Sequence, residues 1–235
     1  MKIFVCDNYE EMSFKVAREI SRQLTVKPTS VLGLATGETP KGMYRKLVKM
    51  YKQKIVDFSE AKTFNLDEFY PIKRENKHSF KNYMQNRLFE EVNLRPKNCF
   101  IPDGEAENPS NECQRYEKEL SHSGQIDLQV LGIGENGHIG FNEPGVEWSS
   151  VTRLVELEDK TVKKEFNTTT GVPNKAITIG VKDIMRANKI VLMASGVRKK
   201  DVVERALKGP ITQEVPASIL QLHPKVKVYL DKEAA

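Results

Sequence analysis

The chain has 235 residues, of which 39% are hydrophobic and 29% charged, and this length and composition suit one α/β domain over residues 1–235. No stretch approaches the roughly 18 consecutive apolar residues of a membrane span, so we expect no membrane contact. The net charge is +5, but acidic residues are interleaved with the basic ones and no basic stripe or helix-turn-helix pattern is present. We therefore expect no nucleic-acid binding and only a mild attraction for small anionic substrates.

The three cysteines, Cys6, Cys99 and Cys113, lie far apart in the sequence and form no Cys-x-x-Cys pair. A sparse and odd set of this kind is typical of reduced thiols in the cytosol. None of them has a metal-ligand spacing with the four histidines, so we expect no metal site. The first residues resemble a strand rather than a secretory signal, and we expect a cytoplasmic protein.

Short apolar runs alternate along the chain with segments of helical periodicity. The predicted strands are residues 2–6, 30–35, 61–66, 126–133, 176–179, 189–194 and 226–230, and the predicted helices are residues 10–25, 41–54, 79–91, 108–121, 199–208 and 216–222. This alternation predicts a mostly parallel sheet with helices on both faces. Ligands of such sheets bind at the carboxyl ends of the strands, so the loops that follow the strands should carry the chemistry.

The loop after the second predicted strand, residues 36–40, has the character of an anion site. Thr39 is a candidate N-cap and Pro40 suits the first position of the helix that follows. The free N–H groups of that first turn and the helix dipole attract an anion, and Gly37 lets the backbone approach it closely. The loop is not a Walker A motif, because Met43 follows where a lysine is required. The alternative is an ordinary capped helix after a tight turn.

Two adjacent carboxylates, Asp67 and Glu68, follow the third predicted strand. Neighbouring side chains on an extended chain point to opposite sides, so one carboxylate can face a cleft while the other serves the structure. A partly desolvated carboxylate at this place suits proton abstraction beside a carbonyl or imine. The alternative is a carboxylate that merely forms a turn or caps a helix.

A long glycine-rich loop, residues 132–145, follows the strand at 126–131 and contains His138 and Glu143. Its beginning matches the dinucleotide pattern Gly-x-Gly-x-x-Gly, but that motif needs a helix at the third glycine, and here glycines and a proline crowd the following residues. We therefore predict a loop in which a carboxylate orients an imidazole for acid–base work. The alternative is a histidine with a purely structural role.

One further cation follows the strand at 189–194, where residues 195–200 open a helix. Lys199 or a neighbour in this segment could reach a bound phosphate. The alternative is an ordinary surface lysine.

Four motifs together resemble the glucosamine-6-phosphate deaminase family, and they are residues 34–40, 64–68, 131–145 and 216–223. The string from Gly137 to Pro144 is highly specific, and the resemblance covers nearly the whole chain. It implies a three-layer, modified Rossmann-like fold. It also implies cofactor-free conversion of a hexosamine 6-phosphate to a ketohexose 6-phosphate and ammonia.

The resemblance also implies roles for particular residues. Asp67 matches the base that moves a proton between C2 and C1 of the sugar, and His138, supported by Glu143, matches the group that opens the ring. The residues that match the phosphate site are the backbone of Gly37, Glu38 and Thr39, together with Lys199.

Three departures from the family pattern bear on this assignment. Asn136 stands where many members have Asp, so the charge support for His138 must come chiefly from Glu143. Phe80 stands where many glucosamine-type members have Tyr, which removes a hydroxyl contact. Glu38 replaces a small residue in the phosphate loop, and we expect its side chain to point away because a phosphate would repel it.

A further departure lies in residues 159–173, which lack the arginine that binds phosphate in glucosamine-type members. Lys163, Lys164 and Arg153 are candidates for its role. The segment is similar to that of galactosamine-6-phosphate isomerases, which favours galactosamine 6-phosphate and its product tagatose 6-phosphate. Glucosamine 6-phosphate, which gives fructose 6-phosphate, is the other possible substrate.

Two other functions are compatible with parts of the pattern. The related 6-phosphogluconolactonases share the fold, but their Gly-His loop resembles Gly-His-x-Ala-Ser-Leu-Phe. A non-catalytic sugar-phosphate sensor domain would be attached to a helix-turn-helix segment. The sequence leaves monomer and homo-oligomer equally open.

Overall fold

The computed structural model describes residues 1–235, with the exception of the side chain of Lys164. Its centre is a seven-stranded sheet whose strands all run parallel. In spatial order these are β1 (Lys2–Cys6), β10 (Val226–Asp231), β9 (Ile190–Ala194), β6 (Leu128–Leu131), β2 (Val31–Leu34), β3 (Lys62–Asn65) and β5 (Cys99–Phe100). The predicted parallel sheet is thus confirmed. Its inner strands β2, β6 and β9 are buried along their whole length, whereas the edge strand β1 is largely exposed.

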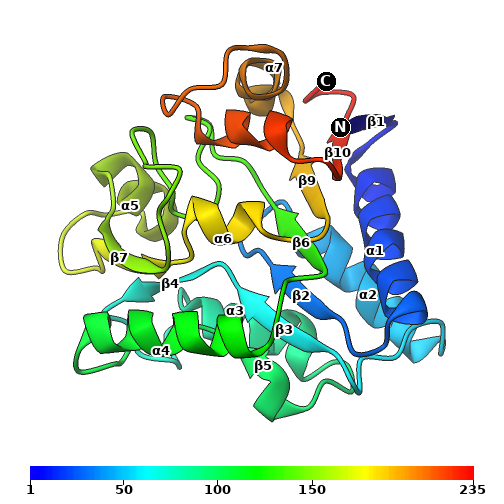
Figure 1. Cartoon of the computed structure of the whole chain (residues 1–235), viewed down its shortest axis with the longest axis horizontal. Coiled ribbons are helices and arrows are strands. Elements are labelled where there is room, and N and C mark those ends of the chain that lie inside the picture. The colour runs from blue at the N-terminus through cyan, green and yellow to red at the C-terminus, as the bar shows by residue number, and fades with distance from the viewer.

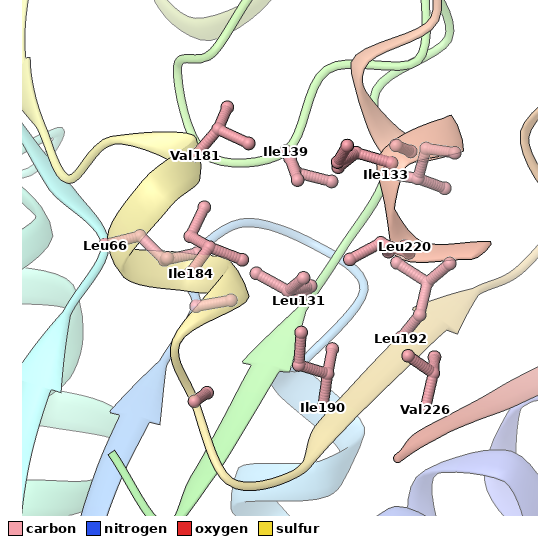
Figure 2. Close-up of a cluster of buried hydrophobic side chains, with 14 of the residues drawn as sticks. Leu66, Leu131, Ile133, Ile139, Val181, Ile184, Ile190, Leu192, Leu220 and Val226 are labelled. Atoms are coloured by element: carbon pink, nitrogen blue, oxygen red, sulfur yellow. The ribbon is translucent and has the colours of Figure 1, made fainter. Parts of the chain in front are cut away.

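Helices cover both faces of this sheet and give the predicted three layers (Figure 1). On one face lie α1 (Tyr9–Val26) and α2 (Lys41–Lys52), which pack around Met12, Val16 and Leu47. On the other face lie α4 (Pro109–His122), α6 (Val181–Met185), α7 (Lys200–Lys208) and the 3₁₀ helix Pro216–Leu222. Figure 2 shows the apolar cluster of this second face, in which side chains of β6, β9 and α6 meet. None of the described helices is long and apolar enough to cross a membrane.

A second sheet, which the sequence analysis did not predict, stands beside the first. It is antiparallel and consists of β4 (Asp67–Tyr70), β8 (Lys175–Thr178) and β7 (Arg153–Glu156). Residues 176–179 were predicted as a strand and do form most of β8, but β8 belongs to this sheet. The small sheet packs against α3 (Phe80–Met84) and α5 (Asp159–Phe166) through an aromatic cluster of Phe69, Phe80, Phe141 and Phe166.

Three local predictions are wrong in detail. Thr39 is not the N-cap of α2: Pro40 occupies that position with helical dihedral angles, and no side chain caps the helix. The helix expected over residues 79–91 is α3 followed by a π-helical turn, Gln85–Phe89. The segment Pro216–Leu222 is a 3₁₀ helix.

Candidate active site

The carboxyl ends of β2, β3, β6 and β9 surround a cavity of about 260 Å³. Residues from all four of the loops that follow these strands line it, as the parallel sheet predicts. Most of the predicted site residues meet there, namely Gly37, Glu38, Thr39, Asp67, His138 and Lys199. In the part of the chain that the structure describes, no three His, Cys, Asp or Glu side chains gather as a metal site would require.

Asp67 faces the cavity from the start of β4 and is buried, with 5% of its surface exposed. Its carboxylate accepts no hydrogen bond from any group that the structure describes. Burial, together with the negative charges of Glu68 and Glu165, raises the pKa of Asp67 well above its usual value. Gly140 packs closely against this carboxylate, since a Cβ atom there would lie 3.3 Å from Asp67 Oδ2 and would crowd it. The result is an unusually basic carboxylate at the cavity wall.

Glu68 points the other way and serves the structure, as the alternation of the strand predicts. Its carboxylate accepts hydrogen bonds from the Ser79 hydroxyl at 2.8 Å and from the backbone N–H groups of Phe80 and Lys81 at 2.9 Å each. These donors form the first turn of α3, whose N-terminus the carboxylate therefore anchors to β4. The predicted division between the two carboxylates, with one in the cleft and one in the structure, is confirmed.

His138 lies in the cavity with its Nδ1 atom 3.2 Å from the carboxylate of Glu143. Glu143 and Asn136 do not line the cavity but stand behind the imidazole. The Asn136 amide donates to Glu143 and its oxygen accepts from the backbone N–H of His138. Thr161 of α5, which the sequence analysis missed, also donates to Glu143 at 3.3 Å. Burial raises the pKa of Glu143, but the bonds from His138, Asn136 and Thr161 outweigh it and lower the pKa overall.

The glycine-rich loop fixes the position of this histidine from both sides. The imidazole lies directly over Gly134, where a Cβ atom would come within 2.4 Å of the ring, and Gly134 N donates to His138 O at 2.9 Å. Ile133 and Ile139 are buried in the apolar cluster below the loop (Figure 2). No helix follows the third glycine, so the prediction of a loop in place of a dinucleotide motif is confirmed.

Asn142 holds the second half of the loop and was not assigned a role from the sequence. Its buried amide donates to Ile139 O and Ile179 O, each at 2.9 Å, and its oxygen accepts from Arg153 at 2.9 Å. The Asn142 side chain thus joins the loop to the small sheet and to the segment that leads into α6.

Residues 36–39 form the opposite wall of the cavity and present unpaired backbone. No described group accepts a hydrogen bond from the N–H of Gly37, Glu38 or Thr39. Gly37 has a φ angle of 93°, which favours glycine, and its carbonyl accepts from the Tyr83 hydroxyl at 2.7 Å. The Tyr9 hydroxyl donates to Thr39 O and accepts from a first-turn N–H of α2. The loop therefore offers the N–H donors that an anion site needs, as expected of the predicted phosphate loop.

The charged residues beside this loop are arranged to receive an anion. The side chain of Glu38 is 87% exposed and pairs with Lys41, so it does point away from the cavity as predicted. Lys199, in the 3₁₀ helix Val197–Lys199, lines the cavity and donates to Ile133 O at 2.7 Å. That bond holds the ammonium group near the anion site.

Two of the three candidates for the missing arginine, Arg153 and Lys163, do not line the cavity. Arg153 is half-buried at β7 and binds Asn142, and Lys163 is exposed on α5. Lys164 lies outside the described side chains. A cation that the sequence analysis did not single out, Arg198, does line the cavity, with its guanidinium group 3.8 Å from Glu135.

A second unpredicted charge, the carboxylate of Glu165, reaches the cavity from α5. Phe80 also lines it and packs against Phe69, so the ring without a hydroxyl faces the ligand space. Neither Glu165 nor Arg198 carries a sequence signal of its own, because each is a common charged residue within or beside a helix. Only the fold brings them to the cavity.

The comparisons with known proteins agree with this geometry. The family model described as glucosamine-6-phosphate isomerases/6-phosphogluconolactonase matches residues 7–229. A glucosamine-6-phosphate deaminase of Clostridium botulinum (strain Hall) is 51% identical over 238 residues, which cover 100% of this chain and 98% of that protein. A second C. botulinum protein of the same name, from strain Eklund 17B, is 48% identical over 100% of this chain and 96% of its own length.

Solved structures give the same grouping. A monomeric glucosamine-6-phosphate deaminase superimposes with a TM-score of 0.97 at 40% identity, covering 100% of this chain and 98% of that one. A 6-phosphogluconolactonase from Thermotoga maritima has a TM-score of 0.80 at 19% identity, covering 98% and 99%, and shows the shared fold alone. By its motifs, its fold and these relatives, the chain belongs to the family of glucosamine-6-phosphate isomerases and 6-phosphogluconolactonases.

Proposed function

We propose that this enzyme converts a hexosamine 6-phosphate into the corresponding ketohexose 6-phosphate and ammonia. The observation that carries the proposal is the meeting of Asp67, His138 and an unpaired anion loop in one cavity. The named relatives, which are deaminases at about half identity over the full chain, support the same reaction class. Its steps need one anion site, one group at the ring oxygen and one base at C2.

The 6-phosphate binds to the N–H groups of Gly37, Glu38 and Thr39 and to the side chain of Lys199. Arg198 supplies the second cation, which the sequence left unassigned. Hydrogen bonds from cations and from free backbone N–H groups to a phosphate are strong, because one partner is fully charged. This contact orients the sugar with its reducing end toward the carboxylates.

His138 then opens the ring by moving a proton from the anomeric hydroxyl to the ring oxygen. The ionised carboxylate of Glu143 fixes the imidazole and supports its positive charge during the transfer. Asn136 positions Glu143 and so acts through it. The product of this step is the open-chain amino aldose.

Asp67 takes the proton from C2 of the open chain and returns it to C1. Its burial raises the pKa of the carboxyl group and so makes it a stronger base toward a carbon acid. As a proton also passes from the nitrogen to O1, the transfer leaves a C1 hydroxyl group and a C2=N bond, and water hydrolyses that bond to release ammonia. No cofactor is needed, since no electrons leave the substrate. We expect the reaction in the cytosol, where Cys6, Cys99 and Cys113 remain the free thiols seen here.

Of the two C4 epimers, we propose galactosamine 6-phosphate as the preferred substrate. The supporting feature is the changed segment 159–173, whose helix α5 contributes Glu165 to the cavity wall beside Asp67. The relatives are named for glucosamine 6-phosphate, so both epimers belong in the test.

The test incubates the protein with each hexosamine 6-phosphate in turn and follows ammonia and ketohexose 6-phosphate. Turnover of galactosamine 6-phosphate alone supports the full proposal, and turnover of glucosamine 6-phosphate alone corrects the epimer. Parallel reactions contain 6-phosphogluconolactone. Lactone hydrolysis without ammonia from either amino sugar would replace the proposal by the lactonase reaction, which the shared fold also permits.

A further inference from the structure

Two tyrosines hold residues 36–39, the phosphate loop of the proposed site, from outside the cavity. The loop lines the cavity, whereas neither Tyr9 nor Tyr83 does. Tyr83 lies on α3, and its hydroxyl donates to the carbonyl oxygen of Gly37 at 2.7 Å. Burial raises the pKa of Tyr83, so the hydroxyl keeps its proton and remains a donor. The Gly37 carbonyl is therefore turned toward Tyr83 and away from the ligand space.

Tyr9, at the start of α1, holds the other end of the loop. Its hydroxyl lies 3.1 Å from Thr39 O and 3.3 Å from Glu38 O, and it accepts a hydrogen bond from Gly42 N at 2.7 Å. A side chain at Gly42 would disturb this contact, because a Cβ atom there would lie 2.9 Å from Cε1 of the Tyr9 ring. One tyrosine thus joins α1, the phosphate loop and the first turn of α2.

The geometry of the peptide group converts these contacts into directions for the N–H groups. In a trans peptide the N–H and the preceding C=O are antiparallel, and the peptide bonds of the loop are trans. A Gly37 carbonyl fixed on Tyr83 therefore aims the N–H of Glu38 the opposite way. A Glu38 carbonyl held near Tyr9 does the same for the N–H of Thr39. Neither N–H group has an acceptor among the described residues, so both are available to a ligand anion.

Gly37 is the place where the loop needs such a restraint. Its φ angle of 93° lies in the region that favours glycine, and a glycine can rotate out of this region without a steric penalty. Rotation of the peptide between Gly37 and Glu38 would bring a carbonyl oxygen to the anion site, where it would repel a phosphate. The Tyr83 hydroxyl opposes this rotation. Glu38 O has a second donor, Lys41 N at 3.3 Å, so the loop depends less on Tyr9.

We propose that Tyr83, assisted by Tyr9, is a positioning residue for the substrate, whose hydroxyl keeps the phosphate loop turned so that its N–H groups bind the 6-phosphate. The inference rests on the proposed function. Phe80 and Tyr83 lie three residues apart on α3 and serve the site differently. Phe80 lines the cavity without a hydroxyl, whereas Tyr83 places its hydroxyl behind the loop. Helix α3 therefore contributes to phosphate binding through the backbone of Gly37.

The test compares Tyr83→Phe, Tyr9→Phe and the double variant with the wild type, by calorimetry with the unreactive ligand hexitol 6-phosphate and by steady-state kinetics. Loss of the Tyr83 hydroxyl should weaken binding and raise KM by about 3- to 10-fold, the range for one hydrogen bond, with kcat nearly unchanged. Tyr9→Phe should have a smaller effect and the double variant the largest. Tyr70→Phe, which removes a hydroxyl bonded to Ala106 O at 2.9 Å outside the cavity, is the matched control and should behave as the wild type.

A spectroscopic measurement separates positioning from a general loss of stability. In ¹⁵N-labelled protein saturated with hexitol 6-phosphate, the amide proton signal of Glu38 should move downfield, and it should move less in Tyr83→Phe. Equal affinities and equal signals in this variant and the wild type would overturn the inference and leave the proposed function standing. A fall in kcat at unchanged affinity would do the same. If the wild type does not bind hexitol 6-phosphate, the sugar-phosphate site itself is wrong and the inference falls with it.

Discussion

The phosphate end of the cavity (residues 36–39 with Arg198 and Lys199) and its acidic end (Asp67 with Glu165) are held by different parts of the fold. The phosphate end follows β2 and β9, which have neighbours on both sides in the large parallel sheet, and much of it is backbone. The acidic end stands on β4, at the edge of the small sheet, and on α5. A backbone N–H group remains when its residue is replaced by any residue other than proline, whereas replacing Asp or Glu by another type of residue removes the carboxylate. In the proposed site, phosphate recognition therefore rests on the main chain, whereas reactivity and the choice of sugar depend on side chains.

The largest effect should come from the acidic end, with Asp67→Asn. An amide cannot accept the C2 proton, so we expect kcat to fall by about 10⁴-fold, the upper end for a positioned base. Hexitol 6-phosphate should bind as in the wild type, because the phosphate end is intact. Steady-state kinetics and incorporation of solvent deuterium into product check this. Deuterium exchange at the wild-type rate in the variant would show that another group is the base.

His138→Gln tests the group between the two ends. Glutamine can hold a hydrogen bond but cannot shuttle a proton, so turnover of the cyclic substrate should fall by about 10²–10³-fold. Glu143→Gln should show a smaller loss, since it leaves the imidazole in place without its charged partner. An unchanged rate in His138→Gln would remove the imidazole from ring opening.

At the phosphate end, Lys199→Ala and Arg198→Ala should each raise KM by about tenfold with kcat nearly unchanged, as expected for binding that is equal in the ground and transition states. Lys200→Ala, a neighbouring exposed lysine outside the cavity, is the control. A fall in kcat at constant KM would contradict the assignment of these two side chains to phosphate binding. An unchanged KM in both variants would mean that the backbone alone holds the phosphate.

The pH dependence offers a subtler test of the acidic end. Burial chiefly raises the pKa of Asp67, and the charges of Glu68 and Glu165 add to the rise. Glu165→Gln removes one of these charges and should lower the pKa. Because the base is active when deprotonated, the acid limb of kcat/KM should move to lower pH. The limb should stay in place in the control Glu156→Gln, which removes an 85% exposed carboxylate from β7. A shift to higher pH in Glu165→Gln would refute the coupling.

The smallest effect concerns stability where α6 packs beside α4. Burial and the neighbouring Glu117 raise the pKa of Asp183 in α6 to about 6. The folded state then holds a proton more tightly than the unfolded state. The free energy of unfolding therefore falls as the pH rises from about 4 to about 6, and the loss is complete above that range. Asp183→Asn should raise the free energy of unfolding by about 1–2 kcal/mol at pH 7 and leave kcat unchanged. Denaturant titrations at pH 4 and pH 7 measure this, and an equal change at both pH values would contradict it.

The large sheet and the loops of the phosphate end were predictable from the sequence for a physical reason. Buried parallel strands must be apolar along their whole length, and the glycines that follow them mark places where the backbone approaches a ligand. The alternation at Asp67 and Glu68 also predicted their opposite directions, which the hydrogen bonds of Glu68 confirm. These features depend on local chemistry.

The small sheet could not be predicted in the same way. Strands β4 and β7 have four residues each, too few for a clear period, and β7 is only partly buried. The arrival of Glu165 and Arg198 at the cavity depends on how α5 and the segment before α7 pack, which no local pattern encodes. The hydrogen bond of Thr161 could not be predicted for the same reason, since its partner Glu143 is 18 residues away in the sequence.

The pairing of β1 with β10 has a consequence for biosynthesis. Strand β1 has β10 as its one neighbour in the sheet, so the ribosome makes Lys2–Cys6 more than two hundred residues before its partner Val226–Asp231. Ile3 and Val5 stay half-exposed even in the folded protein. During translation this strand has no partner within the sheet until residues 226–231 have been made. The ordering of this edge is therefore expected to be a late event in folding.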